Sequence, residues 1–256
     1  MTLDKKLPTF IIGGAPRSGT TFLCHVLDKH PDVFIAKPFS PEPKICLQPA
    51  AQGLAEYKKR YEELFAPVTH QKAWGEKSSA YLENINALNH LKNVITKQTR
   101  FLFIVREPVK RAYSNYLRSK NNGLETLSFS EAVKLEGQRQ DPFPPEKSYV
   151  RPFDYLIRGD YATYAERYLN AFGRDRVKFI LFENIQHAPD AFYKDLQTFI
   201  QVDPLPREKI ATGKINASEP DETLDENLAN ELREKMRPSV ERFSQLTNLD
   251  VSVWGY

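Results

Sequence analysis

The chain has 256 residues, of which 41% are hydrophobic and 27% are charged, and these proportions are ordinary for a soluble globular protein. This length is enough for one large domain with a substantial core. The formal net charge of +3 suits a small anionic ligand and is too weak to indicate nucleic-acid binding.

The first predicted elements are a buried strand and a helix joined by a glycine-rich turn. The apolar run from Phe10 to Ile12 predicts the strand, and two glycines follow it directly. From Thr21 the apolar residues follow a helical spacing, which ends at His30-Pro31. A strand, a tight turn and a helix in this order aim backbone N–H groups and a helix N-terminus at an anion.

The side chains of this turn also suit an anion. Ser18, Thr20 and Thr21 supply hydroxyl donors, and Arg17 supplies a fixed positive charge with a fork of donors. Gly14 and Gly19 are separated by four residues, as in a nucleotide P-loop. Thr20, however, stands where that motif has its phosphate-binding lysine. We therefore predict a phosphate-binding turn that differs from the P-loop of nucleotide hydrolases.

The remaining elements alternate between strands and helices. We predict strands over 32–36, 73–76, 101–105 and 177–182, and helices over 54–65, 85–95, 108–120, 128–136, 155–172, 189–200 and 224–246. Ser128, with Glu131 three residues later, is expected to cap its helix, and Pro238 is expected to break the last one. Residues 203–223 are predicted to be irregular. The alternation predicts an α/β fold, a P-loop-like three-layer domain whose central parallel sheet is flanked by helices, as one domain over 1–256.

A second pair of basic and hydroxyl side chains follows the most apolar predicted strand. Arg106 comes directly after Phe101–Val105, and Ser114 lies eight residues after Arg106. Ligands bind at the carboxyl ends of parallel strands, and Ser114 lies two helical turns further on the same side of the next helix. A positive charge and a hydroxyl from these positions are suited to hold one phosphate.

These two motifs resemble those of a known enzyme family. The segment Pro16 to Leu23 resembles the 5′-phosphosulfate loop of sulfotransferases, which use 3′-phosphoadenosine 5′-phosphosulfate (PAPS). The segment 101–116 resembles their 3′-phosphate-binding element, with Arg106 and Ser114 at the family's Arg and Ser. The chain thus resembles the PAPS-dependent sulfotransferases, in particular the carbohydrate or heparan-type branch and related bacterial enzymes. The resemblance implies PAPS as the sulfuryl donor and adenosine 3′,5′-bisphosphate as its product.

Two further segments of this chain are similar to catalytic segments of that branch. Residues 74–82 resemble a Glu-Lys-(Ser/Thr)-Pro-x-Tyr motif, which implies that Lys77 lines the active site near the sulfate; Ser79 replaces the family proline. Residues 41–46 partly match a Lys-Glu-Pro-(His/Lys)-Phe-Phe loop, without its leading lysine and its aromatics. The resemblance implies that Glu42 is the base that deprotonates the acceptor.

The other implied roles are electrostatic. Arg17 stands where many sulfotransferases have lysine, and it would clamp the bridging oxygen and the charge that develops on the leaving phosphate. Lys214, in a segment similar to a late family loop over the nucleotide, would reach the 3′-phosphate. Arg158 belongs to another family-like segment, and for both Arg158 and Lys214 a solvated surface charge is the open alternative. The predicted cofactor-binding residues are Arg17, Ser18, Gly19, Thr20, Thr21, Arg106, Ser114 and Lys214.

The cysteines and histidines show no spacing typical of metal ligands, and this chemistry requires no metal. Cys24 and Cys46 form no disulfide framework and are expected to be small buried side chains. His25 and His30 are expected to pack or cap, and His70 stays open as an alternative base.

The predicted function is therefore transfer of a sulfuryl group from PAPS to an acceptor hydroxyl or amine, on a sugar or glycolipid. Two alternatives stay open: a P-loop-like nucleotide kinase or NTPase, disfavoured by the missing lysine after Gly19, and a non-catalytic module that binds adenosine bisphosphate. We expect a small-molecule or glycan partner and no nucleic acid. No stretch approaches the about 20 apolar residues of a membrane span, so we expect a cytoplasmic protein.

Overall fold

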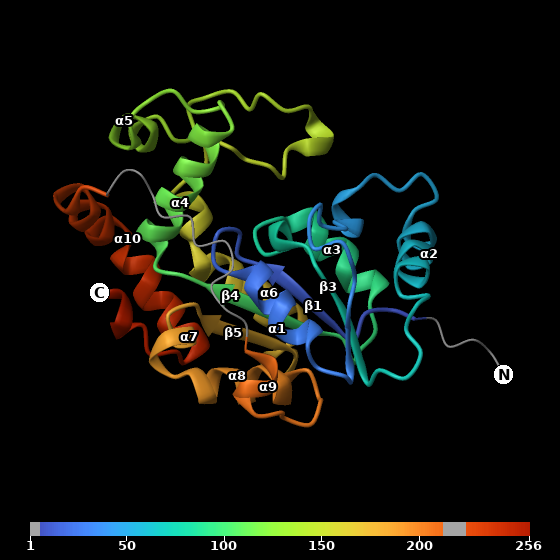
Figure 1. Cartoon of the computed structure of the whole chain (residues 1–256). Helices are drawn as coiled ribbons and strands as arrows, with labels where there is room; N and C mark the ends of the chain where they lie inside the picture. Colours follow the sequence, from blue (N-terminus) through green and yellow to red (C-terminus); the bar gives the residue numbers. More distant parts are fainter. Residues whose placement is uncertain (1–5, 212–223) are drawn as a thin grey trace. The chain divides into compact units, whose positions relative to one another are not determined.

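The computed structural model describes residues 6–211 and 224–256. These residues fall into two compact units, one formed by 6–105 with 168–211 and the other by 106–167 with 224–256. The first unit contains the complete β-sheet and the glycine-rich turn (Figure 1). The organisation of the chain as a single domain stays a prediction.

The first unit is built on five parallel strands in the order β2-β3-β1-β4-β5. The strands are β1 (Phe10–Gly14), β2 (Val33–Ile35), β3 (Ala73–Lys77), β4 (Arg100–Val105) and β5 (Val177–Leu181). Strands β2 and β3 lie on one side of β1 in the sheet, and β4 and β5, which come later in the chain, lie on its other side. Ligands of such sheets bind at the carboxyl ends of the strands where the order reverses. The loops after β1, β3 and β4 are therefore the expected ligand-binding segments.

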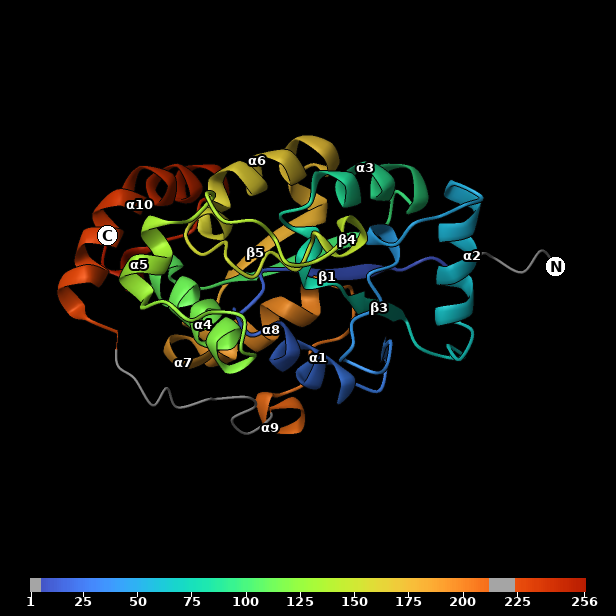
Figure 2. The same cartoon turned by 90° about the horizontal axis from the view of Figure 1, so that it is seen from above.

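Helices cover both faces of this sheet, so the predicted α/β fold with three layers is confirmed. The helices of the first unit are α1 (Thr20–Asp28), α2 (Leu54–Leu64), α3 (Ile85–Val94), α7 (Asn184–His187), α8 (Pro189–Phe199), α9 (Arg207–Ile210) and the end of α6 (Tyr161–Phe172) from Tyr168 onward. Phe10, Ile12 and Leu102 pack in one core cluster with residues of α1 and α8. On the opposite face, the ring centroids of Tyr168 and Phe103 lie 4.6 Å apart. Figure 2 shows α1 and α8 on one side of the strands and α3 on the other.

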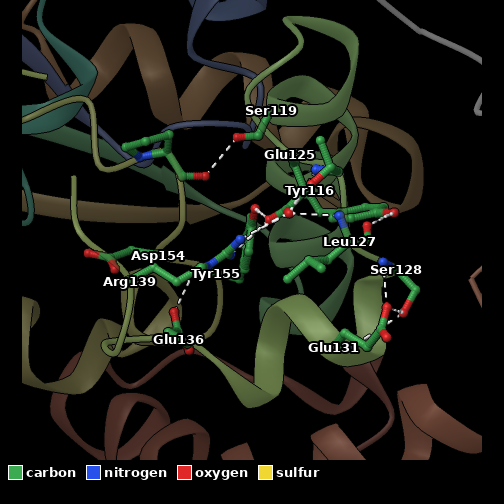
Figure 3. A network of polar contacts seen from close by, with 12 residues as sticks. Tyr116, Ser119, Glu125, Leu127, Ser128, Glu131, Glu136, Arg139, Asp154 and Tyr155 are labelled. Carbon is green, nitrogen blue, oxygen red and sulfur yellow. Dashed lines mark hydrogen bonds and ion pairs between the residues drawn. The ribbon is translucent and has the colours of Figure 1, made fainter. Parts of the chain in front are cut away.

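The second unit contains α4 (Pro108–Asn121), α5 (Phe129–Lys134), α10 (Glu226–Thr247) and the first part of α6. A polar network near α5 holds both ends of the long loop 139–153 (Figure 3). Glu125 accepts hydrogen bonds from the hydroxyl of Tyr155 at 2.6 Å and from Nη1 of Arg139 at 2.9 Å. Glu136 accepts the backbone N–H groups of the two residues after Tyr155, both at 3.2 Å. The loop therefore starts and ends at buried or half-buried anchors.

The capping box predicted at the start of α5 is confirmed, with Ser128 and Glu131 bonded to each other's backbone. The break predicted at Pro238 is wrong, because α10 continues through this residue. Pro238 and Glu234 are both exposed, so the hydrogen bond that proline removes is lost on the solvent side of the helix and not in the core. The short helix α9 also lies in a segment predicted to be irregular.

The surface alternative for Arg158 is also wrong. Its side chain is buried, and Nη1 donates to the backbone carbonyls of Val150 at 3.1 Å and Arg151 at 3.2 Å. Arg158 thus holds the end of the long loop within the second unit. Throughout residues 6–211 and 224–256, no helix combines the length with the apolarity that crossing a bilayer requires.

Candidate active site

The turn after β1 takes its shape from two glycines. Gly14 has φ of 155°, and a Cβ atom built there would lie 2.7 Å from Cβ of Leu82 and 2.9 Å from the carbonyl oxygen of Ser79. Gly19 has φ of 93°, and a Cβ atom there would lie 2.7 Å from the ring of Phe182. Both positions therefore require glycine for conformation and for space. The backbone between them is pressed against its neighbours and leads directly into α1.

The beginning of α1 has features that favour an anion. In the described part of the chain no side chain caps this helix, and its first turn carries no acidic residue. The side chain of Ser18 is fully buried, and its Oγ has no hydrogen-bond partner among the described residues. An unpaired buried hydroxyl is costly unless a ligand engages it, and an open helix N-terminus favours anions.

Three of the predicted residues meet beside this turn. Lys77 is the last residue of β3, and its side chain is buried. Its Nζ donates to Oγ1 of Thr21, in the first turn of α1, at 3.0 Å. The same Nζ lies 3.3 Å from Oε1 of Glu42, which belongs to the loop between β2 and α2. The structure thus brings the candidate base and the candidate active-site lysine to the edge of the phosphate-binding turn.

Ser79 holds the carboxylate of Glu42 through both of its donors. Its backbone N–H donates to Oε2 at 3.0 Å, and its hydroxyl donates to Oε1 at 2.8 Å. Together with Lys77, these bonds restrain the carboxylate in position and in rotation. A proline at this position would supply neither donor. In the sequence Ser79 is only a departure from the family motif, and no local pattern indicates this contact.

The family model of the sulfotransferase domain matches residues 7–237. This chain belongs to the sulfotransferase family. The resemblance inferred from segments 16–23 and 101–116 is therefore confirmed.

Known relatives support the same family. The chain is 34% identical, over 65% of its length, to the membrane-associated sulfotransferase kil1 of Dictyostelium discoideum, and 25% identical, over 77%, to heparan sulfate glucosamine 3-O-sulfotransferase 3A1 of mouse. It spans 32% and 46% of these two proteins. A crystal structure of a sulfotransferase from Alicyclobacillus acidocaldarius superposes with a TM-score of 0.73 at 29% identity, covering 97% of this chain and 99% of that one.

Arg106 and Ser114, which are predicted to bind the 3′-phosphate, lie in the second unit of this sulfotransferase. Arg106 directly follows β4, and its backbone carbonyl accepts a hydrogen bond from the hydroxyl of Tyr161 at 3.0 Å. Glu107 caps α4 by accepting two backbone N–H groups at 3.0 and 2.7 Å. Ser114 is half-buried in α4. Lys214 lies outside the described residues, and the binding roles of these residues stay predictions.

The alternative base His70 lies far from this constellation in the sheet. It is exposed in the segment that precedes the amino end of β3, whereas Lys77 ends the same strand. His30 has a packing role, since Nε2 contacts the carbonyl of Asp203 at 2.9 Å and Nδ1 accepts the N–H of Asp32. Both cysteines are buried, as predicted, and burial raises the pKa of each thiol to about 12.

A fully buried acid, Glu76, lies next to Lys77 in the chain. Its carboxylate accepts hydrogen bonds from Oγ of Ser78 at 2.7 Å and from the hydroxyl of Tyr61 at 3.3 Å. Burial raises the pKa of Glu76 to about 8, although the bond from Ser78 acts in the opposite direction. Glu76 is therefore mostly protonated at neutral pH. The motif at 74–82 contains this residue but indicates no role for it.

Glu76→Gln should remove a pH dependence from the stability of this sulfotransferase. The pKa of the carboxyl rises from 4.5 to about 8 on folding, so the folded state binds more protons between these values. The free energy of unfolding of the wild type should therefore fall as the pH rises from about 4.5 to about 8, by on the order of a few kcal/mol, and then level off. Urea unfolding at pH 5, 7 and 9 checks this. A difference between variant and wild type that stays constant with pH would contradict it.

Proposed function

We propose that this sulfotransferase moves a sulfuryl group from PAPS to a hydroxyl or amine of a sugar or glycolipid acceptor. The observation that carries the proposal is the contact of Lys77 with both Glu42 and Thr21. A base, a positive charge and a phosphate-binding turn are the parts that transfer from a phosphosulfate to an alcohol or amine requires. The family to which the chain belongs supports the same chemistry.

The turn after β1 would hold the 5′-phosphate of the donor. Backbone N–H groups at the start of α1, together with the hydroxyls of Ser18, Thr20 and Thr21, supply hydrogen-bond donors there. Arg17 would stabilise the negative charge that develops as the leaving phosphate departs. Because a guanidinium does not release its proton at ordinary pH, this contribution is electrostatic and not acid catalysis. Bound PAPS supplies the sulfuryl group and a stable bisphosphate leaving group.

Glu42 would take the proton of the acceptor. Ser79 and Lys77 hold its two carboxylate oxygens, so the base is oriented before the acceptor arrives. Preorganisation of this kind lowers the barrier because little rearrangement is left for the reaction itself. Lys77 adds a positive charge next to the phosphate-binding turn, where negative charge gathers.

The second phosphate of the donor would be held by Arg106 and Ser114, with Lys214 reaching it from the late loop. The backbone of Arg106 is restrained, because its carbonyl accepts a hydrogen bond from the hydroxyl of Tyr161 and the capped start of α4 follows directly. A guanidinium on a restrained backbone segment is suited to bind a phosphate through two donors.

The sugar acceptor is supported by the heparan sulfate glucosamine 3-O-sulfotransferases among the relatives. Loops 37–53 and 139–153 would shape the acceptor pocket. In the first loop, the ring of Phe39 packs edge-on against that of His25 at 4.9 Å, so this aromatic is partly used by the core. In the second, Cζ of the Arg139 guanidinium lies over the ring of Phe153, 4.1 Å from the ring centroid. A cytoplasmic location stays a prediction.

Two measurements test the proposed function. Calorimetry should show binding of adenosine 3′,5′-bisphosphate without magnesium, and much weaker binding of ATP with or without it. A labelled-PAPS assay over a panel of sugar hydroxyls, amino sugars and glycolipids should find acceptor-dependent transfer. Preference for Mg-ATP would favour the kinase or NTPase alternative. Tight bisphosphate binding without transfer to any acceptor would favour the non-catalytic module.

A further inference from the structure

The segment after Glu42 is held to the end of β3 by two side-chain hydroxyls. The backbone N–H of Lys44 donates to Oγ of Ser78 at 2.8 Å. The backbone N–H of Cys46 donates to the hydroxyl of Tyr81 at 2.9 Å. The loop that carries Glu42 is therefore anchored twice, within four residues of the carboxylate, by one short stretch of chain.

Glu76 anchors these hydroxyls in turn. Oγ of Ser78 donates to Oε2 of Glu76 at 2.7 Å, which leaves the Ser78 oxygen free to accept from Lys44. Oε1 of Glu76 accepts from the hydroxyl of Tyr61 at 3.3 Å, and that hydroxyl lies 3.4 Å from the hydroxyl of Tyr81. The side chains of Glu76, Ser78, Tyr61 and Tyr81 are all fully buried. A buried hydrogen-bonded network of this kind defines one arrangement of the groups that it joins.

The backbone at Lys44 needs such support. Its φ of 49° lies in the left-handed region, which a residue with a side chain rarely adopts without contacts that hold it there. This turn comes two residues after Glu42, so a change in the conformation of Lys44 would move the carboxylate.

Residues of the stretch 76–81 contact two different parts of the Glu42 loop. Lys77 and Ser79 contact the carboxylate of Glu42 itself, and Ser78 and Tyr81 contact the backbone that follows it. The two kinds of contact come from one continuous segment, and Glu76 accepts the hydroxyl of Ser78 within it.

We propose that Glu76, Ser78 and Tyr81 are positioning residues, and that their buried network sets the place of the Glu42 carboxylate relative to Lys77 and the phosphate-binding turn. The hydrogen bonds of these three side chains join one another, Tyr61 and the backbone at Lys44 and Cys46. They act through the Glu42 loop. The inference rests on the proposed role of Glu42 as the base, and it assigns the device that keeps this base in place.

Amide hydrogen exchange tests the network without any acceptor. Ser78→Ala removes the link between Lys44 and Glu76, and it should speed exchange of the Ser79 N–H, whose acceptor is Glu42, by at least about tenfold. The matched control is Thr99→Val, which removes another fully buried hydroxyl bond, from Oγ1 to the carbonyl of Pro8 at 2.6 Å, at the amino end of β4. The control should leave exchange at Ser79 unchanged. Unchanged exchange at Ser79 in Ser78→Ala, or equal acceleration in the control, would overturn the proposal.

Kinetics with a pair of substitutions at Glu76 provide the second readout. Glu76→Gln keeps a neutral group that accepts from Ser78, and it should retain kcat at pH 7 within about threefold. Glu76→Leu fills similar volume without an acceptor, and it should lower kcat by about 10- to 100-fold, as expected when a catalytic group is misplaced. The Kd of adenosine 3′,5′-bisphosphate should stay within about twofold in both, because the nucleotide turn does not belong to the network.

The outcomes separate this inference from the proposed function. An equal loss of bisphosphate affinity and kcat in Glu76→Leu would indicate general damage and overturn the positioning role. An equal loss of kcat in Glu76→Gln would also overturn it, because the glutamine keeps the network. If the wild type transfers no sulfate to any acceptor, the proposed function fails, while hydrogen exchange at Ser79 still decides whether the network places Glu42.

Discussion

Glu42→Gln should lower kcat for sulfuryl transfer by about 10²- to 10⁴-fold, the usual contribution of a well-placed general base. The amide has nearly the shape of the carboxylate but does not accept the acceptor's proton at neutral pH. One amide oxygen still accepts from Ser79, so the loop should keep its place. Steady-state kinetics with the best acceptor of the panel measure the change, and calorimetry should show bisphosphate binding within a few-fold of the wild type.

The matched control for this prediction is Glu63→Gln on α2. Glu63 also faces a lysine, with its Oε1 3.8 Å from Nζ of Lys59, but this pair is exposed. An exposed pair one helical turn apart contributes only a few tenths of a kcal/mol, so kcat and stability should hardly change. If Glu42→Gln retained kcat within about threefold of the wild type, Glu42 would not be the base.

Arg17→Ala should be the second most damaging substitution, with a loss of kcat of about 10²- to 10³-fold, as when one donor that stabilises developing charge is removed. Arg17 lies in the turn with φ of 69°, and alanine keeps the same Cβ atom, so the backbone strain is unchanged by this substitution. The loss should therefore come from the guanidinium and leave the fold intact. Kinetics and thermal unfolding of the same samples separate the two effects.

Arg17→Lys and Arg174→Ala complete this experiment. Lysine restores a positive charge without the fork of donors, so it should recover part of the lost activity. Arg174 is exposed just before the amino end of β5, whereas the turn follows the carboxyl end of β1. Its removal should therefore leave kcat unchanged. Full activity in Arg17→Ala, or an equal loss in Arg174→Ala, would count against the electrostatic role of Arg17.

The elements with strong local patterns were predictable from the sequence. The run Phe101 to Val105 is apolar at every position, and it lies fully buried in β4, an interior strand of the sheet between β1 and β5. Ser128 and Glu131 carry their capping signal within four residues. Pro238 shows where a local rule stops: proline ends helices unless the freed carbonyl reaches water, and only the exposure of this face decides that.

The site was predictable to the extent that motifs are local. The turn at 13–21 and the strand followed by Arg106 combine residue types whose chemistry and spacing point to phosphates. Glu42 and Lys77 were proposed from partial matches in separate segments. Their contact at 3.3 Å depends on how β2, β3 and the intervening loop pack, which no local pattern expresses.

The sequence by itself determined the alternation of strands and helices, the glycines of the turn and the family to which the chain belongs, because these depend on residue spacing over a few turns of chain. Only the tertiary structure showed that Ser79 donates two hydrogen bonds to Glu42, neither of which a proline would supply. It also showed that Glu76 is fully buried and accepts the hydroxyl of Ser78. Hydrogen bonds act over about 3 Å, so the partners of a side chain depend on which distant segments the sheet brings together. Parallel β2 and β3 bring the Glu42 loop to the end of the strand that carries Lys77, and this packing decides where the candidate base lies.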